Sequence, residues 1–368
     1  MSISNVMVFG YFGFENFGDE LLLDSILQVI ERYGFNNINK IFVLYNFNKE
    51  NFFGRYNILK KYKKVILINR WSWIKIFFVI LVSDVLICSG GLFQDKTSLK
   101  SLIYYLAVIK VAKVFNKKVF VLGTEMDVSD ENKWLVEIGL KNVDFMGVRN
   151  KKEYNSKNFK TEFLSDISFL QYKKSVKDTT VRIVEENSSK KREKIGFMLK
   201  TPSEDVYNDV LNAIVNVCKN LVEEYDICFF PLCLENRKTR RNDFGFVLDI
   251  LKSLDIKNIE CRVWDDASNF MNIFSGIDFA VVSRFHGIVV CLMLGISFLN
   301  VSKESKILNF LEIYPELRKL SVSLEEINSE VIKRYSEIDK NKFESIVVEL
   351  QEVMERKIKN VITTGAKK

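Results

Sequence analysis

Short apolar runs alternate with helical segments along almost the whole chain, and this alternation is the feature that most constrains the fold. In the first half, the runs that predict strands are residues 5–10, 40–45, 65–68, 84–88, 118–122 and 143–148. Segments with helical periodicity lie between them, most clearly at 19–33 and 99–115. Because strand–helix alternation is typical of parallel sheets covered by helices, the first half predicts a doubly wound α/β domain.

The second half repeats this alternation. Its predicted strands are residues 194–199, 225–232, 259–264, 277–283 and 296–301, and its predicted helices are 204–224, 242–254, 267–275, 284–294, 303–312 and the charged segment 340–359. Between the halves lies a polar, charged stretch. We therefore expect an N-terminal α/β domain over 1–170, a connector over 171–193 and a C-terminal α/β domain over 194–368. A length of 368 residues agrees with two domains.

Two doubly wound, Rossmann-like domains that face each other across a cleft would give a GT-B-like architecture. Ligands of such sheets bind at the carboxyl ends of the strands. Polar residues directly after the predicted strands are therefore the candidates for ligand binding.

Composition excludes several classes of function. The net charge of +7 suits an anionic substrate or a membrane surface and is too small to indicate a nucleic acid partner. The six cysteines are scattered, and a single histidine gives no zinc-ligand spacing, so neither a disulfide framework nor a metal site is expected. The first residues, MSISNVMVFG, lack the pattern of a signal peptide, so we expect a cytoplasmic protein.

The segment 71–93 is almost as apolar as a membrane span. Lys75 and the pair 83–84 interrupt it, so the pattern favours a short apolar helix followed by a buried strand. Four aromatic residues stand in the helical part: Trp71, Trp73, Phe77 and Phe78. Packing of these rings in the interior is the simpler interpretation. A peripheral contact with the inner face of the cell membrane stays open as the alternative.

Two glycine-containing segments follow predicted strands. In the first, GYFGFENFGDE (10–20), glycines allow sharp turns, and the following helix start offers free N–H groups to an anion or a sugar. In the second, SGGLFQD (89–95), Gly90 and Gly91 permit close approach of a ligand, while Gln94 and Asp95 can hydrogen-bond to sugar hydroxyls. Either segment could instead be an ordinary tight turn.

The third segment is SRFHG (283–287), between a predicted strand and an apolar helix. Arg284 offers a planar fork that binds carboxylate or phosphate at two points. His286 can transfer protons near neutral pH. A lone histidine is more often structural than catalytic, but this one follows an arginine at the end of a strand where α/β proteins bind ligands.

Taken in order, these segments resemble the polysaccharide pyruvyl transferases. The resemblance rests on GYFGFENFGDELLL, SGGLFQD, GVR (147–149), FFPLC (229–233), SRFHGIVVCLMLGIS and VSKESKI (301–307), and it spans about residues 5–312. The chain departs from the family pattern at three places: Ser89 replaces a glycine, 123–127 reads GTEMD where the family has further glycines, and Asn150 replaces an aspartate.

The resemblance implies a donor, an acceptor and a set of site residues. The donor would be phosphoenolpyruvate, used as a co-substrate with no cofactor or metal. The acceptor would be a sugar, often lipid-linked, of a cell-surface polysaccharide, and the product a pyruvate ketal. His286 would move protons, and Arg284, Arg149 and Lys306 would hold the donor. The residues that would line the acceptor side are Asn16, Asp19, Gly90, Gly91, Gln94 and Asp95.

Two other functions fit the same sequence. A GT-B glycosyltransferase that uses a nucleotide sugar would have the same fold and would also need basic residues, here for a diphosphate. A non-catalytic glycan-binding protein would explain the acidic residues in 123–127, but such a protein has no need for Arg284 and His286 together.

Overall fold

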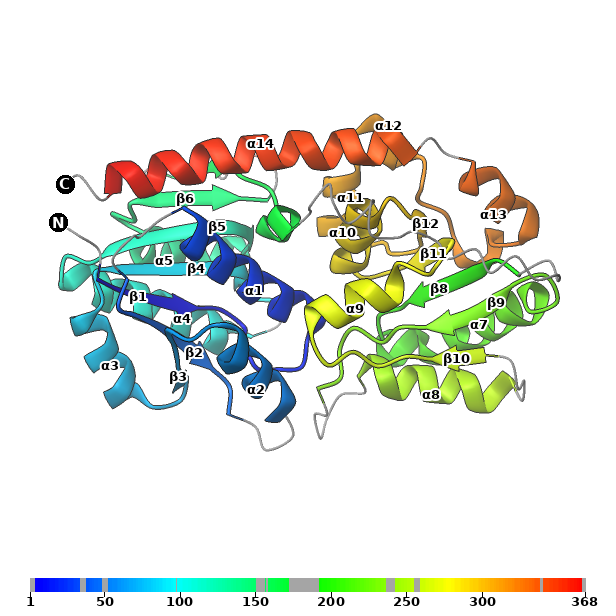
Figure 1. Cartoon of the computed structure of the whole chain (residues 1–368), viewed down its shortest axis with the longest axis horizontal. Coiled ribbons are helices and arrows are strands. Elements are labelled where there is room, and N and C mark those ends of the chain that lie inside the picture. Colours follow the sequence, from blue (N-terminus) through cyan, green and yellow to red (C-terminus); the bar gives the residue numbers. More distant parts are fainter. Residues whose placement is uncertain are drawn as a thin grey trace. The chain divides into compact units, whose positions relative to one another are not determined.

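The computed structural model describes the chain except for residues 1–3, 34–37, 48–51, 97, 150–155, 157, 172–191, 236–241, 255–258, 338–339 and 366–368. Most of the expected connector over 171–193 therefore lies outside the described residues, as does Asn150. Two compact units are present (Figure 1). Unit 1 comprises Met1–Glu15, Asp19–Gln171 and Glu349–Lys368, and unit 2 comprises Asn16–Gly18 and Tyr172–Val348. The chain changes unit after residue 171, close to the predicted boundary, but 16–18 and 349–368 were each expected in the other domain.

Unit 1 is built on a seven-stranded parallel sheet. Its strands, in spatial order, are β3 (Val65–Asn69), β2 (Lys40–Tyr45), β1 (Asn5–Phe9), β4 (Val85–Gln94), β5 (Lys118–Asp127), β6 (Phe145–Val148) and β7 (Glu162–Phe163). In the centre of the sheet, Val6 of β1 lies beside Ile41 of β2 and Val85 of β4. Such strands are buried on both faces, which explains why they read as continuous apolar runs in the sequence.

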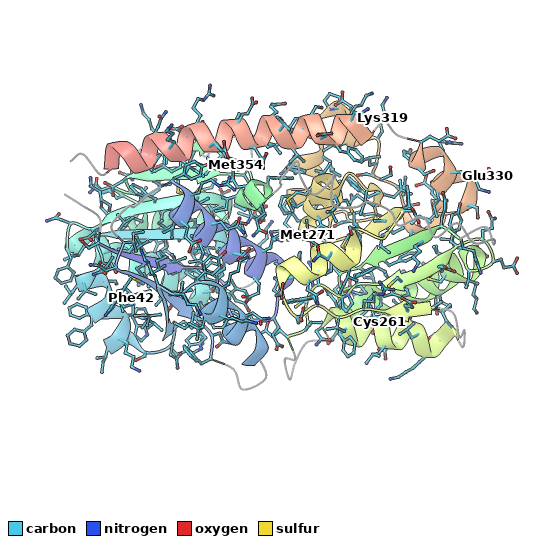
Figure 2. The ribbon with its side chains drawn as sticks, in the orientation of Figure 1. Phe42, Cys261, Met271, Lys319, Glu330 and Met354 are labelled. Carbon is cyan, nitrogen blue, oxygen red and sulfur yellow. The ribbon has the colours of Figure 1, made fainter. Side chains whose placement is uncertain are left out.

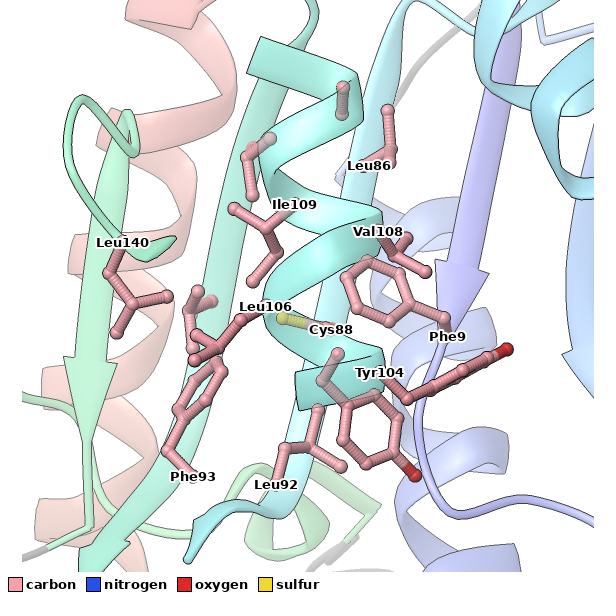
Figure 3. Packing of buried hydrophobic residues seen from close by; sticks show 14 of the residues in the cluster. Phe9, Leu86, Cys88, Leu92, Phe93, Tyr104, Leu106, Val108, Ile109 and Leu140 are labelled. Atoms are coloured by element: carbon pink, nitrogen blue, oxygen red, sulfur yellow. The ribbon is translucent and has the colours of Figure 1, made fainter. Parts of the chain in front are cut away.

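The described helices of unit 1 are α1 (Phe17–Arg32), whose first two residues belong to unit 2, α2 (Phe52–Lys61), α3 (Trp73–Val82), α4 (Leu99–Val114) and α5 (Lys133–Gly139), with short 3₁₀ turns at Asp130–Asn132 and Ile167–Gln171. Figure 3 shows α4 against the sheet: Leu106 and Ile109 of the helix belong to one buried cluster with Phe9 and Cys88 of the strands. Leu102, Tyr105, Ile109 and Ala112 of α4 are buried at helical spacing, so this side of the helix packs against β4 and β5.

The central strands are longer than the sequence predicts. Residues 89–94 continue β4 instead of forming a loop, and 123–127 continue β5, with Gly90 paired to Thr124 and Gln94 to Asp127. The register shifts on both sides of Gly90, whose φ is +105°. A β-bulge with a glycine at positive φ is favoured there because side chains strain such a backbone. The expected loop at SGGLFQD is therefore wrong, and the glycines shape an irregular strand.

Unit 2 contains a five-stranded parallel sheet. Its strands, in spatial order, are β10 (Ile259–Cys261), β9 (Asp226–Phe229), β8 (Lys194–Met198), β11 (Phe279–Val282) and β12 (Ser297–Asn300). Its helices are α7 (Tyr207–Leu221), α8 (Asp243–Leu254), α9 (Ala267–Phe274), α10 (Phe285–Leu294), α11 (Ser305–Leu311), α12 (Pro315–Arg318) and α13 (Ser329–Ser336), with 3₁₀ turns at Glu204–Val206 and Leu324–Glu326. Helix α14 (Lys340–Gly365) begins in unit 2 and ends in unit 1.

The strand order of each unit reverses direction once, as in Rossmann-like folds. The reversal lies between β1 and β4 in unit 1 and between β8 and β11 in unit 2. The predicted fold class of two doubly wound α/β domains is thus confirmed. In such sheets the loops on either side of the reversal diverge, and a ligand binds in the space between them.

The apolar segment 71–93 folds as predicted into a helix, α3, followed by a buried strand, β4. Across the part of the chain that the structure describes, no helix is long and apolar enough to cross a membrane. Interior packing is the wrong interpretation for Trp71, Trp73, Phe77 and Phe78, because all four side chains are exposed. All six cysteines are free thiols.

Helix α10, which carries His286, ends at Gly295 with φ +64°. We expect Gly295→Ala to cost about 1–2 kcal/mol of stability, because a left-handed backbone strains a residue with Cβ. An added Cβ would meet nothing within 4 Å, so strain alone sets this cost. The change in melting temperature measures it. Gly276→Ala is the control: its Cβ would touch only one backbone oxygen, at 3.8 Å. Equal effects of the two substitutions would contradict the interpretation.

Candidate functional site

The C-terminal edge of the unit 2 sheet gathers basic residues from three neighbouring strands. Lys200 follows β8, Arg284 and His286 follow β11, and Lys306 follows β12. Since β8 and β11 flank the reversal of strand order, these residues lie where a ligand is expected in a doubly wound sheet.

Arg284 is held by a buried carboxylate that the sequence did not reveal. Its Nε donates to Asp243 Oδ2 at 2.8 Å, and its Nη2 donates to Asp243 Oδ1 at 2.5 Å. The Asp243 side chain is completely buried. Burial alone would lower the pKa of Arg284, but the facing carboxylate raises it above its usual value. The guanidinium is thus a fixed cation. The two bonds to Asp243 use Nε and Nη2 and do not involve Nη1.

Asp243 also fixes the loops around it. Its Oδ1 accepts the backbone N–H of Thr201 at 3.0 Å, and its Oδ2 accepts that of Cys233 at 3.0 Å. Thr201 follows β8 and Cys233 follows β9, so a single carboxylate joins the ends of two strands to the arginine after a third. Charge-assisted bonds of this kind are stronger and more directional than neutral ones.

A second ionic group lies at the same edge. Glu304, just before α11, pairs with Lys200 Nζ and, at 2.9 Å, with Lys306 Nζ. Burial opposes ionisation of Glu304, but the two lysines outweigh it and lower its pKa to about 2. Burial lowers the pKa of Lys200, and Glu304 partly opposes that effect. Three basic side chains therefore face two carboxylates, which leaves the edge net positive before the histidine is counted.

His286 occupies the first turn of α10 and lies against Gly18. A Cβ placed on Gly18 would come within 1.9 Å of His286 Nδ1, so only glycine leaves space for the imidazole. Helix α10 begins at Phe285, and the first N–H groups of a helix favour an anion beside them. An imidazole in the first turn of a helix, two residues after an arginine, can give or take a proton next to a bound anion.

The segment Asn16–Gly18 is anchored within unit 2. Phe17 is fully buried, with its ring centroid 4.2 Å from that of Phe270 and 5.7 Å from that of Trp264. Its N–H donates to the carbonyl of Leu232 at 2.8 Å. Asn16 Oδ1 accepts the N–H of Gly18 at 3.3 Å. The predicted N-terminal motif thus sends three residues into unit 2 and places Gly18 on the histidine.

In unit 1, a buried arginine holds the loop that follows β1. Arg70 is 2% exposed; its Nη1 donates to the carbonyl of Gly10 at 3.1 Å and its Nη2 to Tyr105 Oη at 3.0 Å. Five rings surround the guanidinium, with centroids 4.9–5.8 Å from its carbon: Tyr11, Phe14, Trp71, Tyr104 and Tyr105. Cation–π contacts are stronger when desolvated, so this cage fixes the aromatic part of the GYFGFENFGDE motif.

Glu20 also bonds to the same loop, at Gly13. Its carboxyl accepts the N–H of Gly13 at 2.7 Å and the hydroxyl of Tyr45 at 3.4 Å. Gly13 has φ +83°, so the loop needs glycine at this position. Burial, supported by the nearby charges of Asp19 and Glu15, raises the pKa of Glu20 to about 8.

Among the residues expected on the acceptor side, Asp19 and Gly90 lie close together, whereas Gln94 and Asp95 bond to neighbouring turns. A Cβ on Gly90 would lie 3.7 Å from Asp19 Oδ1, so the first two motifs of unit 1 meet there. Gln94 Nε2 donates to the carbonyl of Gly91 at 3.1 Å, which closes the strand end upon itself. Asp95 accepts bonds from Ser129 and Asn132 and so holds the turn after β5.

Arg149 serves the interior of unit 1. Its Nε donates to the carbonyl of Gly123 at 2.8 Å, and its Nη2 pairs with Asp166 Oδ2 at 2.8 Å. The Asp166 side chain is completely buried. Arg149, directly after β6, thus joins the middle of β5 to the segment before the 3₁₀ turn at Ile167–Gln171. Arg149 belongs to unit 1, while Arg284 belongs to unit 2.

Sequence reasoning missed the partners of the predicted residues. Asp243 and Glu304 stand in charged surroundings and Arg70 precedes an aromatic pair, so nothing local marks them. Lys200 was accessible to prediction, because it directly follows a predicted strand. No group of three or more His, Cys, Asp or Glu side chains that could hold a metal ion occurs in the described part of the chain.

Comparison with known proteins identifies the chain. Its fold is that of GT-B proteins: it resembles a glycosyltransferase from Rickettsia africae (TM-score 0.55, 11% identity, 98% of this chain and 99% of that one) and a UDP-GlcNAc 2-epimerase from Methanocaldococcus jannaschii (TM-score 0.56, 13% identity, 92% and 94%). A search of curated proteins finds no match. The family model of polysaccharide pyruvyl transferases matches residues 16–305. The chain therefore belongs to this family and is a transferase of polysaccharide biosynthesis.

Gly18 supplies the sharpest test of this site. We expect Gly18→Ala to displace the imidazole of His286, at a cost of about 1–3 kcal/mol for overpacking. Any reaction that uses the imidazole should slow at least about ten-fold, because a shift of about 1 Å in a reacting group has effects of that order or larger. Activity and melting temperature are measured together, with Gly276→Ala as the control in the same unit. Full activity of the Gly18→Ala protein would show that the imidazole position does not matter.

Glu20 predicts a pH dependence of stability. Its folded pKa of about 8 exceeds the ordinary value of 4.5, so folding favours the protonated form. This contribution is complete below pH 4.5 and is lost as the pH rises through 8. Glu20→Gln cannot ionise, so its melting temperature should match wild type near pH 5 and exceed it near pH 8.5. Parallel pH profiles of the two proteins would contradict protonation of Glu20 in the fold.

Proposed function

We propose that the protein transfers the enolpyruvyl group of phosphoenolpyruvate to a sugar of a cell-surface polysaccharide or its lipid-linked precursor, and closes it to a cyclic pyruvate ketal. The observation that carries the proposal is the family match over residues 16–305, which includes both Arg284 and His286. The unit 2 site supplies the matching chemistry, because it places basic side chains and a titratable ring at one sheet edge.

The donor carries a carboxylate and a phosphate, and both need cationic partners. Arg284 is fixed by Asp243 and has Nη1 available beyond those two bonds. Lys200 and Lys306 share Glu304, so the anionic donor would compete with one carboxylate for two ammonium groups. The first turn of α10 adds its N–H groups. A preorganised cluster of this kind stabilises charge without rearrangement at the moment of reaction.

Proton transfer would then proceed as follows. A proton added to the methylene carbon of phosphoenolpyruvate makes the methyl group and leaves an oxocarbenium-like centre. One sugar hydroxyl attacks this centre, which is the carbon that bears the phosphate oxygen. Phosphate then departs, and a second hydroxyl attacks the same carbon and closes the ring. The two hydroxyls lose two protons in total: one balances the new methyl group and the other leaves with phosphate. We assign the proton transfer to His286. General acid–base catalysis by such a group contributes about 10²–10⁴ in rate.

Residues of unit 1 would bind the acceptor. Asp19 and Gly90 lie together at the reversal of its strand order, beside the loop that Arg70 and Glu20 hold. Carboxylate oxygens and backbone groups near glycines are suited to sugar hydroxyls. Asp95 and Gln94 are engaged with their own turns, and we assign them to the shape of this region.

The test is phosphate release from phosphoenolpyruvate in the presence of lipid-linked amino sugars. We expect acceptor-dependent release by wild type, a loss of about 10²–10⁴ in kcat for His286→Ala, and a raised KM for phosphoenolpyruvate with Arg284→Lys. Lysine keeps the charge beside Asp243, whereas alanine would leave that carboxylate buried without a partner. Arg318→Ala, an exposed arginine on α12, is the control and should behave as wild type.

Two results would overturn the proposal. Thermal stabilisation by UDP-sugars, with none by phosphoenolpyruvate, would indicate a nucleotide-sugar glycosyltransferase. Glycan binding without turnover of any donor would indicate a binding protein. An equal loss of activity in Arg318→Ala would show that the effects at Arg284 are not specific to the site.

A further inference from the structure

Helix α3 is apolar at every position except Lys75, although only one side packs against the sheet. Ile76, Val79 and Ile80 are buried in the core of unit 1. The opposite side carries Ile74, Phe77 and Phe78, which have exposed fractions of 74%, 41% and 61%. A helix that is hydrophobic all round is normally enclosed by protein or lipid. The outer side of α3 is exposed instead of enclosed, and side chains extend outward from this helix in Figure 2.

The exposed apolar residues continue from α3 onto α4. The rings of Phe77 and Phe115 are 5.6 Å apart, and those of Trp73 and Tyr104 are 5.2 Å apart. We call this area the α3–α4 surface; its exposed members are Trp71, Trp73, Ile74, Phe77, Phe78, Val82, Leu99, Ile103, Val114 and Phe115. Contiguous exposed apolar patches on a protein surface mark interaction sites.

The charges on this surface have one sign. Lys75 is the only charged residue of α3, and α4 carries Lys100, Lys110 and Lys113 with no acidic residue. Lys113 is paired with Asp144 at 2.7 Å, while Lys75, Lys100 and Lys110 are exposed. Asp84, which follows α3, accepts hydrogen bonds from the backbone N–H groups of Ser4 and Asn5.

We propose that the α3–α4 surface docks on a membrane whose lipids are anionic. Tryptophan and phenylalanine side chains insert at the boundary between headgroups and acyl chains, and lysines reach the headgroup phosphates on flexible stems. Each lysine near an anionic surface strengthens this attraction. A protein partner would bring acidic groups to fixed positions, whereas the three exposed lysines are spread along two helices. This inference does not depend on the proposed pyruvyl transfer.

The test is sedimentation of the full chain with vesicles. Binding to phosphatidylcholine vesicles that contain phosphatidylglycerol should exceed binding to pure phosphatidylcholine and should weaken as salt rises. The double substitution Ile74→Ser/Phe78→Ser, on one turn of the exposed side, should weaken binding at least about ten-fold, since both side chains lose apolar area buried in lipid. Lys75→Glu should reduce the preference for phosphatidylglycerol.

The matched control lies on α5. Trp134 and Ile138 have the same spacing and similar exposure, at 58% and 52%, but Asp130 and Glu131 flank them. Trp134→Ser/Ile138→Ser should bind vesicles as wild type does. Equal loss with this control, or no preference for anionic vesicles, would overturn the proposal. So would a concentration-dependent dimer that Ile74→Ser/Phe78→Ser dissolves, because a second copy would then cover the surface.

Discussion

The ion pair between Arg284 and Asp243 is the interaction on which the unit 2 site depends. A buried carboxylate must be matched by charge and by hydrogen bonds, and Asp243 meets both requirements with one arginine and the N–H groups after β8 and β9. The same bonds fix the direction of the arginine. Rigidity and charge at this edge therefore have a single origin, and the loops cannot move without uncovering a buried charge.

Unit 1 reaches rigidity by different means. Arg70 is enclosed by rings and carbonyl groups, and Glu20 is held neutral over part of the physiological pH range by burial. Both groups bond to the loop between β1 and α1, Arg70 at Gly10 and Glu20 at Gly13. Unit 2 thus presents an ion pair at its strand ends, whereas unit 1 holds its loop with an arginine among aromatic rings and with a protonated carboxyl group.

The fold was largely predictable, because strands buried on both faces leave continuous apolar runs and their order follows from helix crossovers. The extension of β4 was not, since a Ser-Gly-Gly sequence has the composition of a turn and only pairing with β5 makes it a strand. At the site, Arg284 and His286 stood out by position. Asp243 did not, because it lies 41 residues away in sequence and its role depends on tertiary contacts. The exposed rings of α3 were misjudged because apolar residues lie on both its buried and its exposed sides, so the sequence pattern does not mark which rings face outward.

The path of the chain between units has a consequence for biosynthesis. Residues 16–18 pack on Leu232, Trp264 and Phe270, which leave the ribosome more than 200 residues later, and unit 1 also contains the terminal segment 349–368. The first unit therefore cannot complete its native contacts while translation continues. Long-range contacts of this kind slow folding and expose apolar surface to nascent-chain chaperones. Helix α14 supplies residues to both units, so a chain without this helix would lack part of each.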